Sequence, residues 1–424
     1  MTTRDKVPAL DAGMLSRVEK IAALEKVKAA LDVCAEETER AMAEQVRIAQ
    51  IESPTFAERT RGEAVMELLQ EYGLKDVVMD PSGNVVGRRP GKSGGPVLAI
   101  AAHLDTVFPQ GTDLRVRKEG ALYYGPGIGD NASGLRSMLQ VLRALNKAQI
   151  ETAGDILFVG TVGEEGNGDI RGAKALFDGS RRIDGFMALD MADVNTVQNG
   201  ATGAHRWRIA IEGQGGHSYI DYGRAPSAIH AMCRAGSIIA DIVTPEDPRT
   251  TFTIGTIKGG TTVNTIAARC EVDVDMRSTG LEELDRLEKQ ILGAFEKGVE
   301  LENARWPQAD PDHQLKLTKT QIGNRPAGMQ PDNSPAVQAA LCAMKHMAIE
   351  VQQCRPSSTD ANKPISIGVP SVCIGTGGVT HNEHSLKEFF DSTDMELGPQ
   401  LAILTALALV GAEGVEPGLS PLAG

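Results

Sequence analysis

Apolar residues follow a helical spacing in the first part of the chain. Between residues 14 and 52 they recur every three or four positions with charged residues in the gaps, which predicts an amphipathic helix or a pair of helices. A second helix is predicted at about 56–73. The segment VVMDPSGNVVGRRPG then predicts a hairpin that turns at residues 81–84.

Short and almost unbroken apolar runs come next, and a polar loop follows each of them. The runs are PVLAIAA (96–102), DILFVGTV (155–162), GFMALD (185–190) and PSVCIGTGG (370–378). Runs of this length without alternation are typical of strands that are buried on both faces. Because the stretches between them are helix-like, the sequence predicts an α/β fold in which helices cover a mostly parallel sheet.

The pattern changes near residue 203, where HRWRIAIEG alternates as a strand with one exposed face does. The predicted elements that follow are a helix at about 225–243, strands at TFTIGTI and IAARCEVDVDMRS, a helix at 281–299 and a strand at 314–321. The order β-α-β-β-α-β is that of a ferredoxin-like α+β unit. We therefore predict a main domain formed by residues 1–202 and 325–424, with an inserted domain at 203–324.

Composition narrows the range of partners. The 43 basic and 56 acidic residues give a net charge of −13, which disfavours nucleic acids and anionic membranes as partners. The six cysteines form no CxxC pair, so we expect reduced thiols. The N-terminal residues form no apolar targeting segment, and apolar runs stay short of a membrane span. These features together predict a cytoplasmic protein.

Acidic and imidazole side chains follow the predicted strands. They are His103, Asp105, Asp130, Glu164, Glu165, Asp190 and His384. Ligands of open α/β sheets bind beyond the carboxyl ends of the strands, so we expect these side chains to meet at one edge. Each of them alone has an ordinary structural explanation, such as a helix cap or a solvated acid. Their joint placement favours a site for divalent metal ions.

Five motifs together resemble those of a known family. They are HLDTVFP, GPGIGDNASG, TVGEEGNGDIRG, ALDMAD and GGVTHNEHSLKE, and the similarity extends from about residue 50 to 410. The family is that of the dinuclear zinc metallopeptidases, which includes peptidase T, glutamate carboxypeptidase, acetylornithine and succinyl-diaminopimelate deacylases and aminoacylase. The resemblance implies a catalytic α/β domain with an inserted lid or dimerisation domain. It also implies a homodimer formed through the insertion, and hydrolysis of a C–N amide bond in a small peptide or an N-acyl amino acid.

The resemblance further implies a metal-ligand set. His103 and Asp190 would bind one divalent ion, Glu165 and His384 a second one, and Asp130 would bridge the two. The expected metal is Zn²⁺, although Co²⁺ and Mn²⁺ accept the same ligands.

The same resemblance implies roles for two further acidic residues and a cis conformation for one peptide bond. Asp105 would hold His103 in its ligating tautomer, and Glu164 would be the general base that moves a proton from water to the leaving nitrogen. The peptide bond between Asp130 and Asn131 would be cis.

His381 is a second candidate for the last metal ligand. We prefer His384 because Glu388 follows it four residues later, as in the family's His-xxx-Glu pattern. His381 would then line the mouth of the site or have no special role.

The inserted domain contains three more candidate catalytic or substrate-binding residues. His217, in GQGGHSYIDYGRAPSAIHAM, resembles a lid histidine that stabilises the oxyanion, often from the partner subunit; the alternative is an exposed loop histidine. Asn264 resembles a residue that contacts the substrate and the oxyanion. Arg277 resembles an arginine that holds a substrate carboxylate, and its alternative is a salt bridge at a strand end.

Other functions stay open at this point. A deacylase or an N-carbamoyl amino-acid amidohydrolase would use the same metal core and differ only in pocket residues. A non-catalytic binding or regulatory member of the family would be expected to lack the base or a ligand, and this sequence contains both.

Overall fold

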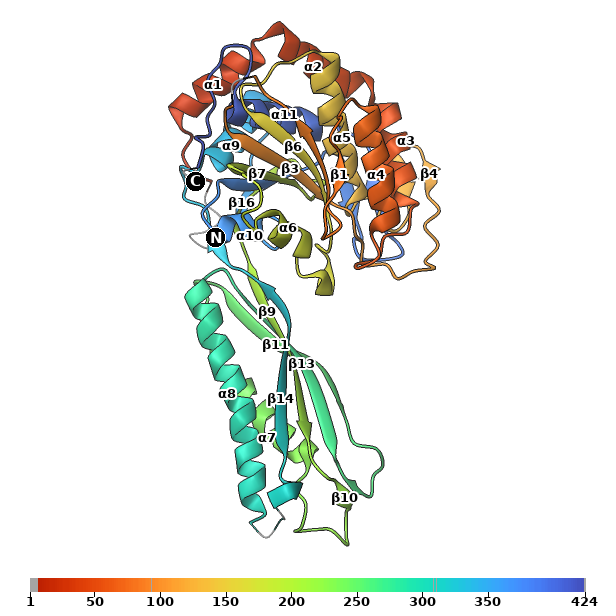
Figure 1. Cartoon of the computed structure of the whole chain (residues 1–424), viewed down its shortest axis with the longest axis vertical. Coiled ribbons are helices and arrows are strands. Elements are labelled where there is room, and N and C mark those ends of the chain that lie inside the picture. The colour runs from red at the N-terminus through yellow and green to blue at the C-terminus, as the bar shows by residue number, and fades with distance from the viewer. Residues whose placement is uncertain (1–6, 93, 308, 310, 423–424) are drawn as a thin grey trace. The chain divides into compact units, whose positions relative to one another are not determined.

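The computed structural model describes residues 7–92, 94–307, 309 and 311–422. The chain divides into two compact units, of which one is Met1–Ala201 with Met329–Gly424 and the other is Thr202–Gly328 (Figure 1). The second unit therefore interrupts the first in the sequence.

The first unit contains a nine-stranded mixed sheet with the order β1-β2-β6-β3-β7-β17-β8-β15, in which β16 also pairs with β8. The strands are β1 (Val78–Met79), β2 (Val85–Arg89), β3 (Val97–His103), β6 (Asp155–Thr161), β7 (Gly185–Leu189), β8 (Thr196–Ala201), β15 (Gly328–Met329), β16 (Gln353–Ser357) and β17 (Ser371–Ile374). Strands β6, β3, β7 and β17 run parallel to one another. The predicted α/β architecture with a mostly parallel sheet is confirmed.

Helices surround this sheet (Figure 1). They are α1 (Ala12–Ala22), α2 (Glu25–Glu36), α3 (Thr38–Ala49), α4 (Arg59–Glu71), α5 (Ala132–Lys147), α6 (Arg171–Leu176), α9 (Pro335–His346), α10 (Asn362–Ser366) and α11 (Leu397–Val410). The region 14–52 thus forms three helices rather than one or two. The helical spacing of apolar residues continues across both breaks, so it did not reveal them. Within the described ranges, the helices are too short or too polar to cross a membrane.

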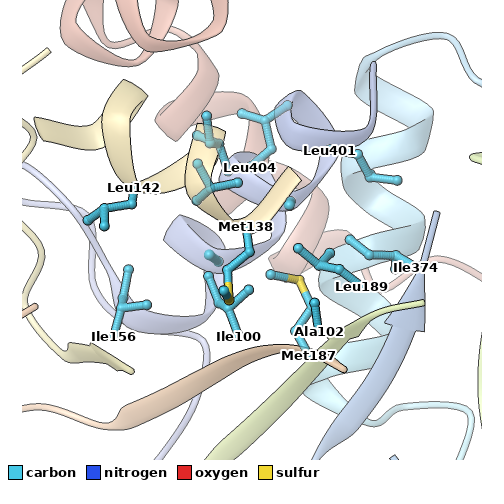
Figure 2. Close-up of a cluster of buried hydrophobic side chains, with 14 of the residues drawn as sticks. Ile100, Ala102, Met138, Leu142, Ile156, Met187, Leu189, Ile374, Leu401 and Leu404 are labelled. Atoms are coloured by element: carbon cyan, nitrogen blue, oxygen red, sulfur yellow. The ribbon is translucent and has the colours of Figure 1, made fainter. Parts of the chain in front are cut away.

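Strand β3 shows why the apolar runs lack alternation. Ile100 on one face packs with Met138 of α5 and Leu404 of α11 (Figure 2). Ala99 on the other face belongs to a separate buried cluster that includes Ile365 of α10. Since successive side chains of a strand point to opposite faces, a sheet covered on both faces needs apolar residues at every position.

The first unit also contains a small antiparallel sheet that the pattern of apolar residues does not predict. It has the order β18-β19-β5-β4, and its strands are β4 (Arg117–Glu119), β5 (Leu122–Tyr124), β18 (Val379–His381) and β19 (Phe389–Asp391). Strands of three residues are too short to show a periodicity. This sheet brings the segment after β3 beside the segment that carries His384.

The second unit has a four-stranded antiparallel sheet with the order β11-β13-β9-β14. In chain order its main elements are β9 (Gly203–Glu212), α7 (Ala228–Ala240), β11 (Thr250–Gly259), β13 (Arg269–Ser278), α8 (Leu281–Arg305) and β14 (Lys316–Arg325). Helices α7 and α8 lie side by side and share a buried apolar cluster with the sheet (Figure 1). A short pair, β10 (Gly216–His217) with β12 (Thr265–Ile266), lies outside this sheet. The lid or dimerisation role of the unit stays a prediction.

Thiol reactivity tests this packing. The six cysteines are all free, and Cys233 is the exposed one among them. Burial raises the pKa of Cys34 and of Cys354 to about 12, so these thiols stay protonated at neutral pH. We expect the native protein to react rapidly with one equivalent of a thiol reagent and the unfolded protein with six. The rapid reaction should disappear in Cys233→Ser, and several rapidly reacting thiols in the native protein would contradict the structure.

Candidate functional site

Side chains from five segments of the first unit meet at the carboxyl edge of the sheet. His103 Nε2 lies 3.0 Å from Asp130 Oδ1 and 3.4 Å from Asp190 Oδ1. His384 Nε2 lies 2.9 Å from Asp130 Oδ2 and 2.9 Å from Glu165 Oε1. Each carboxylate oxygen of Asp130 therefore faces a different imidazole. The structure brings together all five residues that the sequence proposed as metal ligands.

The turn that carries Asp130 is fixed to the end of β7. Asn131 caps α5 by accepting a hydrogen bond from the Gly134 N–H at 3.0 Å, and its side-chain amide donates to the Leu189 carbonyl at 2.9 Å. A Cβ at Gly134 would lie 2.2 Å from that same carbonyl, so only glycine permits the close approach. The peptide bond between Asp130 and Asn131 is cis, as the family resemblance implied.

Asp105 is fully buried beneath this cluster. Its Oδ1 accepts a hydrogen bond from the Glu164 N–H at 2.9 Å, and its Oδ2 accepts from the Glu165 N–H at 3.0 Å. The Thr55 hydroxyl donates a further bond of 2.8 Å to Oδ2. His103 Nδ1 is closer to the backbone carbonyl of Asp105, at 3.0 Å, than to its Oδ1, at 3.6 Å. The carboxylate thus holds the Glu164–Glu165 turn, while the carbonyl orients the imidazole.

The charges of the cluster favour a cation at its centre. Burial alone would lower the pKa of His103, but the carboxylates of Asp190, Asp105 and Asp130 raise it well above its usual value. Hydrogen bonds to Asp130 and Glu165 raise the pKa of His384 to about 11. Carboxylates arranged in this way stabilise a proton on each imidazole or, in its place, a metal cation bound by the imidazoles and the carboxylates.

The environment of Asp130 Oδ1 favours a metal cation over a proton at the centre of the cluster. Asp130 Oδ1 is inaccessible to solvent and makes no hydrogen bond of suitable geometry within the described structure, although an imidazole nitrogen lies 3.0 Å away. A buried carboxylate oxygen ordinarily has a hydrogen-bond or metal partner. The donor set of imidazole nitrogens and carboxylate oxygens therefore fits divalent ions such as Zn²⁺.

Glu388 has a structural role that its sequence motif does not indicate. Its buried carboxylate accepts hydrogen bonds from three backbone N–H groups. The donors are Gly127 at 2.7 Å, Gly129 at 2.9 Å and Asp130 at 3.1 Å. Burial raises the pKa of Glu388 to about 7. Glu388 thus fixes the backbone of the turn that presents Asp130.

Asp360 is a second buried acid near the site that the sequence pattern does not indicate. It lies on the loop before α10, and its buried carboxylate accepts a hydrogen bond from the Thr161 hydroxyl. Burial raises its pKa to about 6, and its charge interacts with those of His103 and Asp190. No strand end or turn pattern in the sequence marks this position, because the residue reaches the site from a loop.

The two candidate histidines of the 379–388 segment behave differently. The ring of His381 stacks on Phe389, with ring centroids 4.5 Å apart. His384, which contacts Asp130 and Glu165, has a positive φ of 59°, an uncommon conformation that is enriched at functional sites. The geometry favours His384 as the ligand.

The three candidates of the insertion belong to the other unit. His217 is exposed, and its Nδ1 accepts a hydrogen bond from the Tyr219 N–H at 3.2 Å. The Asn264 side chain accepts a hydrogen bond from the Thr262 hydroxyl. Arg277 pairs with Asp275 at 2.8 Å, which agrees with its alternative interpretation as a strand salt bridge. The catalytic and substrate-binding roles of the three stay predictions.

A second group with metal-binding side chains occurs in the same unit, formed by His205, Asp285 and Glu288. Here His205 Nδ1 lies 2.7 Å from Glu288 Oε2, and Trp207 donates to Glu288 Oε1 at 2.6 Å. The Glu288 carboxylate therefore already has partners on both oxygens, and the group is explained as a hydrogen-bonded contact between α8 and β9.

Comparison with known sequences identifies relatives of the chain. The model of peptidase family M20/M25/M40 matches residues 99–409. A succinyl-diaminopimelate desuccinylase from Hydrogenovibrio crunogenus is 27% identical over 264 residues, which are 56% of this chain and 68% of that enzyme. The chain spans about half the length of other curated relatives that it matches.

Solved structures share the fold. A tripeptidase from Staphylococcus aureus superimposes with a TM-score of 0.73 at 26% sequence identity, over 87% of this chain and 97% of that one. A dinuclear metal-binding peptidase from Bacillus subtilis has a TM-score of 0.64 at 17% identity, over 89% and 99% of the two chains.

Replacement of Glu388 tests how the turn is held. We expect Glu388→Gln to weaken Zn²⁺ binding by about 10- to 100-fold, as is typical when a residue that orients a ligand is lost. The physical reason is that glutamine keeps one acceptor oxygen and puts an NH₂ group against a backbone N–H. The measurement is competitive titration with a zinc chelator, with circular dichroism to check the fold. Glu36→Gln, at an exposed position of α2, is the control. Unchanged zinc affinity in folded Glu388→Gln would contradict this role.

Proposed function

This chain belongs to peptidase family M20/M25/M40, and we propose that it hydrolyses the C–N amide bond of a small peptide or an N-acyl amino acid with the help of two divalent metal ions. Members of the family are metal-dependent hydrolases of peptide or acyl-amino-acid substrates. The observation that carries the proposal is the position of Asp130, whose two carboxylate oxygens each face a different imidazole. A carboxylate placed in this way suits a pair of cations better than a single one.

The ligands divide into two sets around Asp130. His103 and Asp190 would hold one ion, Glu165 and His384 the other, and Asp130 both. Zn²⁺ is the expected metal, with Co²⁺ or Mn²⁺ as alternatives. When bound, such ions polarise the scissile carbonyl and lower the pKa of the attacking water.

Glu164 is the proposed general base. It is 6% exposed and immediately precedes Glu165, and Asp105 holds the backbone amides of both residues. Neighbouring residues of an extended segment point in different directions, so one carboxylate can face the metal site while the other faces the substrate side. Glu164 would accept a proton from the attacking water and deliver it to the leaving nitrogen. Asp105 would position Glu164 by fixing this turn.

The insertion would complete the site in a homodimer. His217 would stabilise the oxyanion, while Asn264 and Arg277 would contact the substrate. Tyr219 and Ile220, which follow His217, are 87% and 65% exposed. Exposed apolar side chains that cluster in this way are common where a partner docks, which supports the proposed dimer.

A deacylase is the alternative within the same chemistry. The desuccinylase relative favours it, since that enzyme is named for removing a succinyl group, whereas the tripeptidase neighbour favours a peptide substrate. The metal ligands and Glu164 would serve both reactions. A substrate panel of di- and tripeptides with N-acyl and N-carbamoyl amino acids distinguishes the two.

Replacement of the proposed base tests the mechanism. We expect Glu164→Gln to lower kcat by about 10²- to 10⁴-fold, because the amide cannot accept a proton from water. The measurement is steady-state hydrolysis of the best substrate of the panel, with metal content measured on the same sample. Glu36→Gln again serves as the control. A Glu164→Gln variant that binds metal and keeps full activity would refute the assignment.

Removal of the metal tests the class of enzyme. We expect dialysis against a chelator to abolish hydrolysis and to lower the melting temperature, because carboxylates crowded at the site then lose the cations that compensate them. Addition of Zn²⁺, Co²⁺ or Mn²⁺ should restore both. Activity that survives complete removal of metal would exclude a metallohydrolase.

A further inference from the structure

The first unit contains a large cleft beside the proposed metal site. Its volume is about 1250 Å³, and it lies between the segment after β3 and the loop from β18 to β19. His384 lines the cleft and also contacts Asp130 and Glu165. A ligand that reaches those carboxylates can therefore extend past His384 into the cleft. The volume suffices for a group the size of one or two amino-acid residues.

Aromatic side chains form part of its wall. The rings of Tyr124 and Phe389 lie with their centroids 5.3 Å apart, and both line the cleft. The Arg117 guanidinium lies 4.4 Å from the centroid of the Tyr124 ring and pairs with Glu119. These contacts give the cleft a defined wall with an apolar part.

The positively charged side chains on the wall of the cleft differ in whether an acidic side chain pairs with them. Arg115 is held by Asp113 through bonds of 2.6 to 3.1 Å, and Arg117 by Glu119, so both of these cations are compensated. Lys387 is exposed on the wall and has no acidic partner within the part of the chain that the structure describes. The lining acid Glu388 directs its carboxylate at backbone amides and is thereby occupied. The cleft therefore carries one uncompensated positive charge, at Lys387.

We propose that this cleft is a subsite for a carboxylate-bearing arm of the substrate and that Lys387 determines the preference for it. The arm is an acidic acyl group or an acidic side chain, and the two share the chemistry that a lysine ammonium recognises. The inference rests on the proposed function, because the scissile bond must lie at the carboxylate and imidazole cluster for the arm to reach the cleft.

Pairs of substrates that differ only in this charge test the proposal. The pairs are N-succinyl-L-alanine with N-succinamoyl-L-alanine, for an acyl arm, and glutamyl-alanine with glutaminyl-alanine, for a side-chain arm. We expect the metal-loaded wild-type enzyme to prefer the charged member of at least one pair, and the pair that shows the preference identifies the source of the arm.

Variants of Lys387 then test whether this residue causes the preference for the charged substrate. Lys387→Met should lower kcat/KM for the charged member by about five- to tenfold, the loss of one partly exposed charged contact, and leave the neutral member within about twofold. Lys387→Arg should retain the preference. Lys345→Met, exposed at the end of α9 and outside the cleft wall, is the matched control. Equal effects of Lys387→Met on both members, or no effect on either, would overturn the proposal.

A binding measurement separates this proposal from the proposed function. Calorimetric titration of zinc-loaded Glu164→Gln with N-succinyl-L-alanine and with its neutral amide needs no turnover. If wild-type protein hydrolyses no substrate but the charge preference in binding disappears with Lys387→Met, the subsite stands and the hydrolase assignment falls. If hydrolysis occurs without any charge preference, the hydrolase stands and the subsite falls.

Discussion

The structure of the site depends on the carboxylate of Asp130, whose Oδ1 is inaccessible to solvent. A carboxylate taken out of water must be compensated by cations or hydrogen-bond donors, and here an imidazole faces each of its oxygens. Asp190 and Glu165 add negative charge on the two sides. Three carboxylates this close together repel one another, so the arrangement is stable only when protons or metal cations lie between them. The same requirement makes the cluster suitable for the divalent ions proposed to bind there.

Around this centre the chain fixes loops through carboxylates that accept backbone hydrogen bonds. Asp105 holds the turn with Glu164 and Glu165, and Glu388 holds the turn with Asp130. Both acids are buried and approach the turns from other segments of the chain. The sheet positions the strand ends, while these two carboxylates orient the backbone beyond them. These hydrogen bonds hold the backbone that carries the residues proposed for metal binding and for proton transfer.

Much of this arrangement was predictable from the sequence. The unbroken apolar runs predicted the parallel strands, because a strand that is buried on both faces has apolar residues at nearly every position. The strand-end positions of His103 and Asp190 followed from the same runs. Their assignment to a metal pair came from the resemblance of five motifs to a family, not from spacing alone.

Other features left no local signal. The three-residue strands β4, β5, β18 and β19 are too short for a pattern, so the cleft that they border was not foreseen. Glu388 and Asp360 reach the site from loops, and their burial depends on tertiary contacts with segments far away in the chain. The sequence likewise treated Asp105 only as a partner of His103, because its bonds to the Glu164–Glu165 turn join two different strand ends.

The most direct test of the account is to locate the metal ions in crystals of the zinc-loaded protein by anomalous diffraction on both sides of the zinc absorption edge. We expect two peaks per chain, roughly 3.5–4 Å apart. One peak should lie beside His103 and Asp190, the other beside Glu165 and His384, with Asp130 between them. A chain that binds zinc only elsewhere, for example at His205 and Glu288, or that shows no peak beside Asp130 at saturating zinc, would contradict it.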